Sequence, residues 1–240
     1  MIPRFFCPDS LPQGGELELP KVVAHHADKV LRLRAGAPLV LFDGDGREVE
    51  ARLLTVGRHC RVELLRWSAP DRESPLQTVL VQSLPSAEKM DWIVQKAVEL
   101  GVTAIQPVIA ERSVSRVSGD RAERRARHWQ QVAISACEQS GRNRLPRLEP
   151  ILALGHWLGQ VGQAVPILLT PGCGRHLAEL PKPVGAAYLM VGPEGGWSER
   201  ELAMCDVAGC VGVGLGPRVL RAETAGLAAL AAMQLLWGDF

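Results

Sequence analysis

Two glycine-rich stretches near the carboxyl end of the chain place polar residues beside apolar runs. Residues 191–198 read VGPEGGWS, in which Ser198, together with Glu201, has the pattern of a capping box at a helix start. Residues 214–224 read GLGPRVLRAET, a turn that leads into a helix-favouring segment rich in alanine and leucine. Bare glycine backbone lets a ligand lie close, and open α/β sheets bind ligands at the carboxyl ends of their strands. The two stretches therefore predict a ligand site at two strand-to-helix junctions.

The amino-acid sequence of these two stretches resembles that of a known protein family. GPEGGWSxxE followed by LGPRVLRAETA is similar to the bacterial ribosomal RNA small-subunit methyltransferase E family of knotted SPOUT methyltransferases, and the resemblance runs from residue 3 to residue 239. It implies methylation of ring nitrogen N3 of one uridine in small-subunit ribosomal RNA, with S-adenosylmethionine as cofactor. It also implies a C-terminal trefoil knot, in which residues 214–221 thread through a loop. The periodicity of the sequence does not indicate that knot.

The resemblance implies that three loops form the cofactor pocket. Backbone amides and carbonyls would bind the adenine edge, and apolar side chains would form the walls. Gly212, Gly214 and Gly216 lack the spacing of a dinucleotide fingerprint, and no P-loop lysine occurs, so the sequence does not predict a phosphate site. The expected cofactor-binding residues are Leu169, Thr170, Pro171, Gly192, Glu194, Gly195, Gly196, Leu215, Gly216, Arg218 and Leu220.

Methylation at N3 requires loss of the proton that neutral uridine carries there. A carboxylate could take this proton, and a guanidinium beside O2 or O4 could stabilise the resulting anion. Glu223 and Glu138 have simpler alternatives, because an acid suits a helix start and residues 138–142 suit a helix end. The sequence does not choose the base among Glu138, Glu194 and Glu223. The candidate catalytic residues are Arg112, Glu138, Arg142, Arg221 and Glu223, with Arg218 as a further cation.

Arginines are concentrated between residues 112 and 147. This segment has nine arginines and three acidic residues, a net charge of +6, whereas the whole chain carries only +1. Clustered positive charge indicates a phosphate-binding surface, and arginine suits bidentate contacts to phosphates or bases. The alternative is an ordinary solvated helix face. The candidate RNA-binding residues are Arg4, Arg116, Arg121, Arg124, Arg125 and Arg144.

Composition limits the remaining classes of function. The chain has 240 residues, of which 47% are hydrophobic, so it can bury a substantial core. Apolar runs stay below the roughly 18 residues that a membrane span needs, and the first residues lack the pattern of a secretory signal. We therefore expect a cytoplasmic protein that does not enter the membrane. The six cysteines form no CxxC pair and show no zinc-ligand spacing, so no metal site is predicted.

Two domains are expected around a polar, proline-containing linker at 69–75. Residues 1–72 predict a helix over 22–33 and strands over 39–42, 48–56 and 60–67, with a hairpin turn at 43–46. The resemblance makes this module a PUA-like β-barrel that binds RNA, although a barrel that only packs against the rest fits equally well. Residues 73–240 predict an α/β domain with a mostly parallel sheet. Its expected strands are 78–84, 104–109, 166–169, 186–191 and 211–215, and its expected helices are 87–100, 118–139 and 222–236. Ser86 is expected to cap the first of these helices, and Gly101 is expected to end it.

The last of these helices is apolar nearly all round, which is typical of a helix buried on more than one side. Together with the resemblance, this predicts a homodimer that acts on small-subunit ribosomal RNA, either naked or within the assembled subunit. Two alternatives stay open at this point. One is a non-catalytic RNA-binding assembly factor, and the other is a transfer RNA methyltransferase of the same fold.

Overall fold

The computed structural model describes residues 2–57, 59–114 and 117–240, which form two compact units. The first unit combines Met1–Glu73 with Cys137–Leu145, and the second combines Ser74–Ala136 with Pro146–Phe240. The segment 137–145 belongs to the first unit because Arg72 donates a 2.9 Å hydrogen bond to the carbonyl of Gly141 and Arg4 hydrogen-bonds Asn143. The expected domain division at residue 72 did not include this segment.

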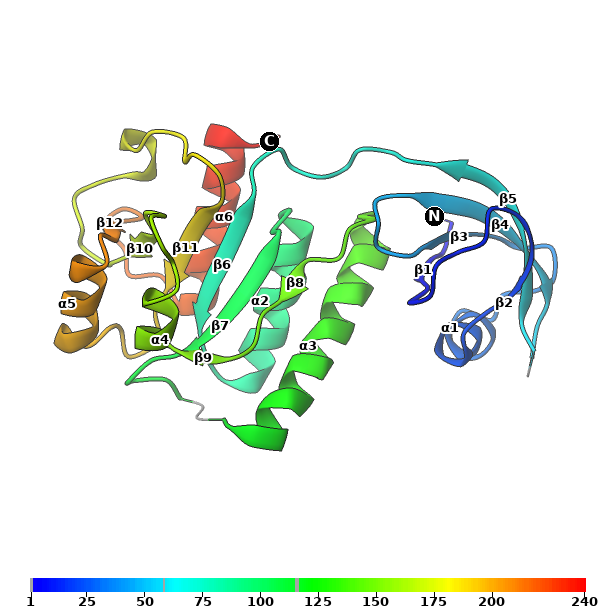
Figure 1. Cartoon of the computed structure of the whole chain (residues 1–240), viewed down its shortest axis with the longest axis horizontal. Coiled ribbons are helices and arrows are strands. Elements are labelled where there is room, and N and C mark those ends of the chain that lie inside the picture. Colours follow the sequence, from blue (N-terminus) through cyan, green and yellow to red (C-terminus); the bar gives the residue numbers. More distant parts are fainter. Residues whose placement is uncertain (1, 58, 115–116) are drawn as a thin grey trace. The chain divides into compact units, whose positions relative to one another are not determined.

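The first unit is built on a five-stranded sheet in the order β1-β3-β4-β5-β2 (Figure 1). Strands β1 and β3 pair in parallel and the other neighbours pair antiparallel. The predicted three-stranded meander is confirmed as β3, β4 and β5, whereas the sequence did not indicate the two edge strands. The bounds are β1 Arg4–Phe6, β2 Gly15–Glu18, β3 Pro38–Phe42, β4 Glu48–Thr55 and β5 Arg61–Ser68.

The helix expected at 22–33 is shorter and less regular in the structure. An α-helix, α1 (Lys21–His25), continues as a π-helix, η1 (His26–Val30). Val23, Ala24 and Ala27 are buried against the sheet's core, together with Phe5 and Leu41. The apolar residues of this segment did not mark its buried face, because Val22, Val30 and Leu31 are exposed, and the sequence could not reveal its wider π-turn.

The second unit has an entirely parallel sheet in the order β12-β10-β11-β6-β7-β8, with β9 also paired to β7. This confirms the predicted α/β fold. The expected strand 104–109 matches β7 residue for residue, because a short and mainly apolar run between turns is a strong signal even with Gln106 inside it. The bounds are β6 Thr78–Ser83, β7 Ala104–Ile109, β8 Arg147–Leu148, β9 Leu152–Ala153, β10 Ile167–Leu169, β11 Ala187–Val191 and β12 Val211–Val213.

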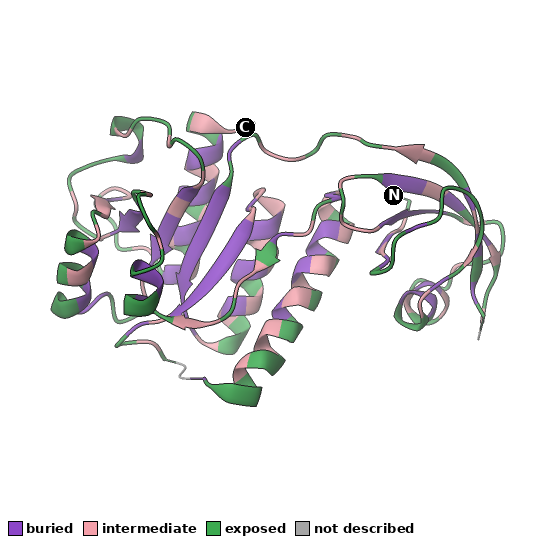
Figure 2. Ribbon diagram, in the orientation of Figure 1, coloured by how far each residue is buried: buried purple, intermediate pink, exposed green. Residues whose placement is uncertain are grey.

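Helices cover both faces of the parallel sheet, so its central strands are buried on both sides (Figure 2). Successive side chains of a strand point to opposite faces. Val79 and Val81 accordingly join the core that includes residues of α4 and α5, whereas Leu80 and Gln82 lie near Gly226 of α6. The helical elements are α2 Ala87–Glu99, α3 Gly119–Ser140, α4 Leu154–Leu158, η2 Leu177–Glu179, α5 Glu199–Val207 and α6 Ala222–Trp237.

The ends of α2 follow the sequence prediction only in part. Gly101 adopts a φ of +80°, which suits its predicted role of ending the helix. Ser86 occupies the position before the first turn, but its hydroxyl makes no capping hydrogen bond within the described part of the chain, so the predicted cap is wrong. In the same described residues, no helix is both long and apolar enough to cross a membrane.

Candidate functional site

A cavity of about 570 Å³ lies at the carboxyl ends of β10, β11 and β12, where the sequence predicted a ligand site. Strand β10 pairs with both β11 and β12, so the loops that follow these three strands meet at one edge of the sheet. A volume of this size is typical of small-molecule and cofactor sites. Ten of the expected cofactor-binding residues line the cavity: Leu169, Thr170, Pro171, Gly192, Glu194, Gly196, Leu215, Gly216, Arg218 and Leu220.

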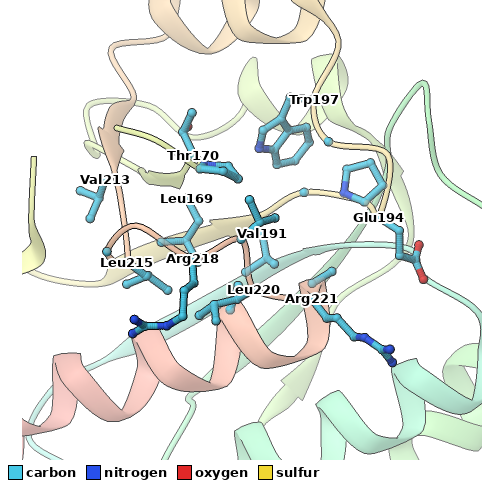
Figure 3. A pocket seen from close by; sticks show the side chains of 18 of the residues that line it. Leu169, Thr170, Val191, Glu194, Trp197, Val213, Leu215, Arg218, Leu220 and Arg221 are labelled. Atoms are coloured by element: carbon cyan, nitrogen blue, oxygen red, sulfur yellow. The ribbon is translucent and has the colours of Figure 1, made fainter. Parts of the chain in front are cut away.

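Apolar side chains form the inner walls of the cavity, and charged side chains stand at its mouth. Figure 3 shows Trp197 and Thr170 on one side and Leu220 and Leu215 on the other. Arg218, Arg221 and Glu194 are exposed and extend outward from the loops. The site can therefore hold a ligand with an apolar or aromatic body and polar or charged ends.

Close backbone packing shapes the loop that follows β12. Gly214 donates a 2.9 Å hydrogen bond to the carbonyl of Arg175, and a Cβ at position 214 would overlap the carbonyl oxygen of Cys173. Only glycine fits there. Gly216 has a φ of +86°, a conformation that residues with a Cβ adopt at a cost. The loop after β10 and the loop after β12 therefore support each other, whereas the trefoil knot implied by the resemblance stays a prediction.

Trp197 is a wall of the cavity that the sequence analysis did not assign to the site. Its side chain is buried, and a Cβ at Gly192 would lie 3.1 Å from the edge of the indole ring. Gly192 therefore gives the ring room to pack against bare backbone. The indole N–H has no hydrogen-bond partner within the described residues.

The predicted capping box at the start of α5 is confirmed. The backbone N–H of Glu201 donates to the Ser198 hydroxyl over 3.1 Å, and the backbone N–H of Ser198 donates to the Glu201 carboxylate over 2.8 Å. This reciprocal pair fixes the point at which the glycine-rich loop turns into a helix.

Lys89, in the first turn of α2, also lines the cavity. Its ammonium group lies 3.0 Å from a carboxylate oxygen of Glu194 and 3.4 Å from one of Glu223. The sequence analysis treated residue 89 as part of an ordinary helix, because nothing local shows that two distant carboxylates approach it. Glu223 is thus connected to the cavity through Lys89.

Arg112 follows β7 and lies against the glycine-rich loop. Its guanidinium donates a 2.9 Å hydrogen bond to the carbonyl of Gly195 and a 3.4 Å hydrogen bond to that of Trp197. Gly195, the one expected cofactor-binding residue that does not line the cavity, packs against the Arg112 side chain, with 3.2 Å between an ideal Cβ and the Cβ of Arg112.

Glu138 and Arg142 belong to the first unit and have partners inside it. The Glu138 carboxylate accepts a 3.0 Å hydrogen bond from the backbone N–H of Phe6, and burial raises the pKa of this carboxyl group. Arg142 is buried and its guanidinium binds Glu73. These contacts account for both residues structurally, and their proposed catalytic roles stay predictions.

The arginines expected to bind RNA fall into distinct environments. Arg121 and Arg124 are exposed on the first turns of α3, Arg125 is half-buried there, and Arg144 is exposed in the first unit. Arg116 lies outside the described residues. Each arginine on α3 that is exposed can reach an external phosphate without first breaking a buried contact.

Arg4 differs from these arginines because its side chain is buried in the first unit. Its guanidinium lies 2.6 Å from the carboxylate of Glu48, which Arg72 also contacts at 2.9 Å. Burial alone would raise the pKa of Glu48, but the hydrogen bonds from Arg72 and Arg4 outweigh it and lower this pKa to about 2. Arg4 therefore acts as the partner of a buried carboxylate, and its expected role in RNA binding stays a prediction.

The described residues contain no group of three or more histidine, cysteine, aspartate or glutamate side chains arranged to hold a metal ion. The six cysteines are free thiols, and burial raises the pKa of Cys7 and Cys137 to about 12. Thiols of this kind are protonated at neutral pH, so these two are poor nucleophiles.

Two protein-family models and several known proteins match the sequence of this chain. A family model described as an RNA methyltransferase domain matches residues 72–234, and one described as an RNA methyltransferase PUA domain matches residues 21–64. The ribosomal RNA small subunit methyltransferase E of Buchnera aphidicola subsp. Schizaphis graminum is 31% identical over 99% of this chain and 98% of its own length.

Two solved structures cover 100% of this chain and 100% of their own chains. One is a ribosomal RNA small subunit methyltransferase E from Neisseria gonorrhoeae bound to S-adenosyl methionine, with 44% identity and a TM-score of 0.94. The other is a putative methyltransferase from Legionella pneumophila in complex with the cofactor SAM, with 33% identity and a TM-score of 0.96. From its methyltransferase domain and its full-length similarity to these proteins, the chain belongs to the ribosomal RNA small subunit methyltransferase E family.

Proposed function

We propose that the protein is an S-adenosylmethionine-dependent methyltransferase that modifies N3 of a uridine in small-subunit ribosomal RNA. The observation that carries this proposal is the cavity at the carboxyl ends of β10, β11 and β12, lined by the loops that the family resemblance assigns to the cofactor. The Neisseria relative that is bound to S-adenosyl methionine matches this chain over its full length.

The residues of the cavity fit this cofactor chemically. Leu169, Leu215 and Leu220 offer apolar walls for a nucleoside, and the glycines leave backbone amides and carbonyls open to its polar edge. Glu194 at the mouth, together with Glu223 next to it, suits a ligand that carries positive charge. When bound, S-adenosylmethionine supplies the methyl group on a sulfonium sulfur.

The chain's own residues would prepare uridine to accept that methyl group. A carboxylate takes the N3 proton, N3 forms the new bond to carbon, and the sulfur–carbon bond breaks to leave a neutral thioether. Among the candidate catalytic residues, Arg221 lines the cavity and Glu223 contacts its wall through Lys89. We therefore propose Glu223 as the proton acceptor and Arg221 as the cation that stabilises negative charge on the uracil oxygens.

The exposed arginines of α3 are the proposed RNA contacts in the second unit. Arg121 and Arg124 are exposed and Arg125 is half-buried, all within two turns of one helix. Such a group can bind phosphates of a folded RNA without reading its sequence. Recognition of one particular uridine would then depend on the shape of the RNA and on the cavity itself.

We further propose that the protein acts as a homodimer. Trp92 on α2 is 52% exposed, and Leu235 and Leu236 near the end of α6 are 70% and 41% exposed. Helices α2 and α6 pack against each other within the second unit, so these apolar side chains belong to neighbouring elements. An apolar face of this kind suits a self-complementary twofold contact.

Two measurements test the proposed function. Isothermal titration should detect one S-adenosylmethionine site per chain, and transfer of a labelled methyl group should go to small-subunit ribosomal RNA rather than to transfer RNA. Cofactor binding without transfer to any RNA would favour the assembly-factor alternative. Transfer to transfer RNA alone would overturn the proposed substrate.

A further inference from the structure

Glu201 does more in this structure than cap the helix that it begins. Its side chain is buried, with the whole residue only 3% exposed. One carboxylate oxygen, Oε2, accepts the capping hydrogen bond from Ser198. The other oxygen, Oε1, accepts a 2.8 Å hydrogen bond from the backbone N–H of Glu111, in the segment that follows β7. A capping box needs only the first of these contacts.

The residue next to Glu111 reaches back to the same glycine-rich loop. Arg112 donates hydrogen bonds to the carbonyls of Gly195 and Trp197, and its aliphatic stem packs on Gly195. The loop 192–197 is therefore held at two points by one short segment. The Glu201 carboxylate accepts from the backbone of that segment, and the Arg112 side chain donates to the backbone of the loop.

Burial of the Glu201 carboxylate by itself lowers the free energy of unfolding. A buried carboxylate loses its hydration, and that loss must be offset by hydrogen bonds to its charged form. An apolar residue at position 201 would avoid the cost but would leave the backbone N–H of Glu111 without this partner. Residues of the same loop, among them Gly192, Glu194 and Gly196, line the cofactor cavity.

We propose that Arg112 and Glu201 are positioning residues that hold the loop 192–197 in the shape that binds the cofactor. This role for Arg112 replaces a direct contact between its guanidinium and the uridine. The inference rests on the proposed function, because it concerns the cofactor cavity of that function. It predicts that loss of either residue weakens cofactor binding and leaves the rate of methyl transfer at saturating cofactor nearly unchanged.

Two substitutions separate the clamp, meaning the contacts of Glu201 and Arg112 that hold the loop 192–197, from helix capping and from packing. Glu201→Gln keeps the capping box, because glutamine also serves at this position, but its amide nitrogen cannot accept from the second N–H. Arg112→Met keeps an unbranched stem against Gly195 and removes the guanidinium. The matched controls are Glu199→Gln in the same helical turn and Arg127→Met on α3, whose side chain is 70% exposed.

The first measurement is the affinity for S-adenosylmethionine by isothermal titration, with kcat determined at saturating cofactor. Both variants should raise Kd at least about fivefold, the scale of one ordinary intramolecular hydrogen bond, with kcat within about twofold of the parent. Both controls should keep the parental Kd. A fall in kcat at saturating cofactor in Arg112→Met, with its Kd unchanged, would overturn the inference. It would instead favour a direct contact between the Arg112 guanidinium and the uridine.

The second measurement needs neither ligand nor activity. The N–H of Gly196 donates to the carbonyl of Pro193 over 2.8 Å within the loop, so its hydrogen exchange reports whether the loop keeps its shape. Exchange in peptides covering 192–198 should be at least about fivefold faster in the two variants than in the parent and the controls. Unchanged hydrogen exchange in both variants would show that Arg112 and Glu201 do not hold the loop in its shape, and would overturn the inference. A parent chain that does not bind the cofactor would overturn the proposed function instead.

Discussion

The ammonium group of Lys89 lies 3.0 Å from a carboxylate oxygen of Glu194, so the first turn of α2 is tied directly to the glycine-rich loop after β11. The hydrogen bond that Lys89 donates to Glu194 raises the pKa of Lys89, and Glu223 approaches the same ammonium group from the first turn of α6. One lysine thus partly neutralises two carboxylates at the mouth of the cavity.

Removing Lys89 should sharpen the preference for a cationic ligand. S-adenosylmethionine carries one more positive charge than its product S-adenosylhomocysteine, and Lys89 opposes that charge. Loss of one charge interaction across roughly 7 Å in water-like surroundings changes binding by about 0.6 kcal/mol. In Lys89→Met the ratio of the two affinities should therefore shift about threefold towards S-adenosylmethionine, measured by titration. Lys96→Met on the same helix is the control, and an equal shift there would contradict this account.

Gly216 should be essential for cofactor binding but not for folding. Its φ of +86° disfavours any residue with a Cβ, although no atom lies within 4 Å of the position that a Cβ would take. Backbone strain on the order of 1–2 kcal/mol should distort the loop in Gly216→Val and weaken S-adenosylmethionine binding at least about tenfold. Gly174→Val, in a loop with an ordinary φ and open space, is the control. Parental affinity in Gly216→Val, measured by titration, would show that this loop does not shape the cavity.

The arginines of α3 should control affinity for RNA and not for the cofactor. Replacing Arg121, Arg124 and Arg125 by alanine should weaken binding of small-subunit ribosomal RNA fragments. It should also reduce the slope of log affinity against log salt by up to about one per lost phosphate contact. Filter binding at several salt concentrations measures that slope, and the unchanged Kd for S-adenosylmethionine serves as the control. A parental salt slope would assign these side chains to an ordinary solvated helix face.

The proposed dimer depends on the apolar end of α6. Sedimentation equilibrium at micromolar concentration should give about twice the chain mass of 26.0 kDa. Replacing Leu235 and Leu236 together by serine should shift the mass towards the monomer, since both side chains are largely exposed on a single chain. Val184→Ser, at a fully exposed site elsewhere, should leave the mass unchanged. A parental mass near 26.0 kDa would contradict the dimer.

The fold was predictable where the local pattern and the tertiary environment agree. Strand β7 is mainly apolar, with Gln106 as its one polar residue, and it is buried on both faces, so its sequence alone indicates its bounds. Strands β1, β8 and β9 have two or three residues each, too few to show a period. The π-turn after His25 could not be foreseen either, because its hydrogen bonds leave no distinct residue pattern.

The candidate site was predictable in its backbone and less so in its side-chain contacts. Glycine and proline mark the loops directly, because they limit the conformations that the chain can adopt. The long-range contacts of Lys89, Glu201 and Arg4 join residues 44 to 139 positions apart, and no local pattern reports them. Arg4 is an example, since the sequence does not show that its guanidinium contacts the buried carboxylate of Glu48.

The central claim is methylation of small-subunit ribosomal RNA at N3 of a uridine. Mass spectrometry of nucleosides from that RNA, in a strain lacking the gene and in the same strain with the gene restored, tests it most directly. We predict that N3-methyluridine is absent from the deletion strain and returns with the parental gene, but not with a gene encoding Gly216→Val. Equal N3-methyluridine in the deletion strain and the restored strain would contradict the account.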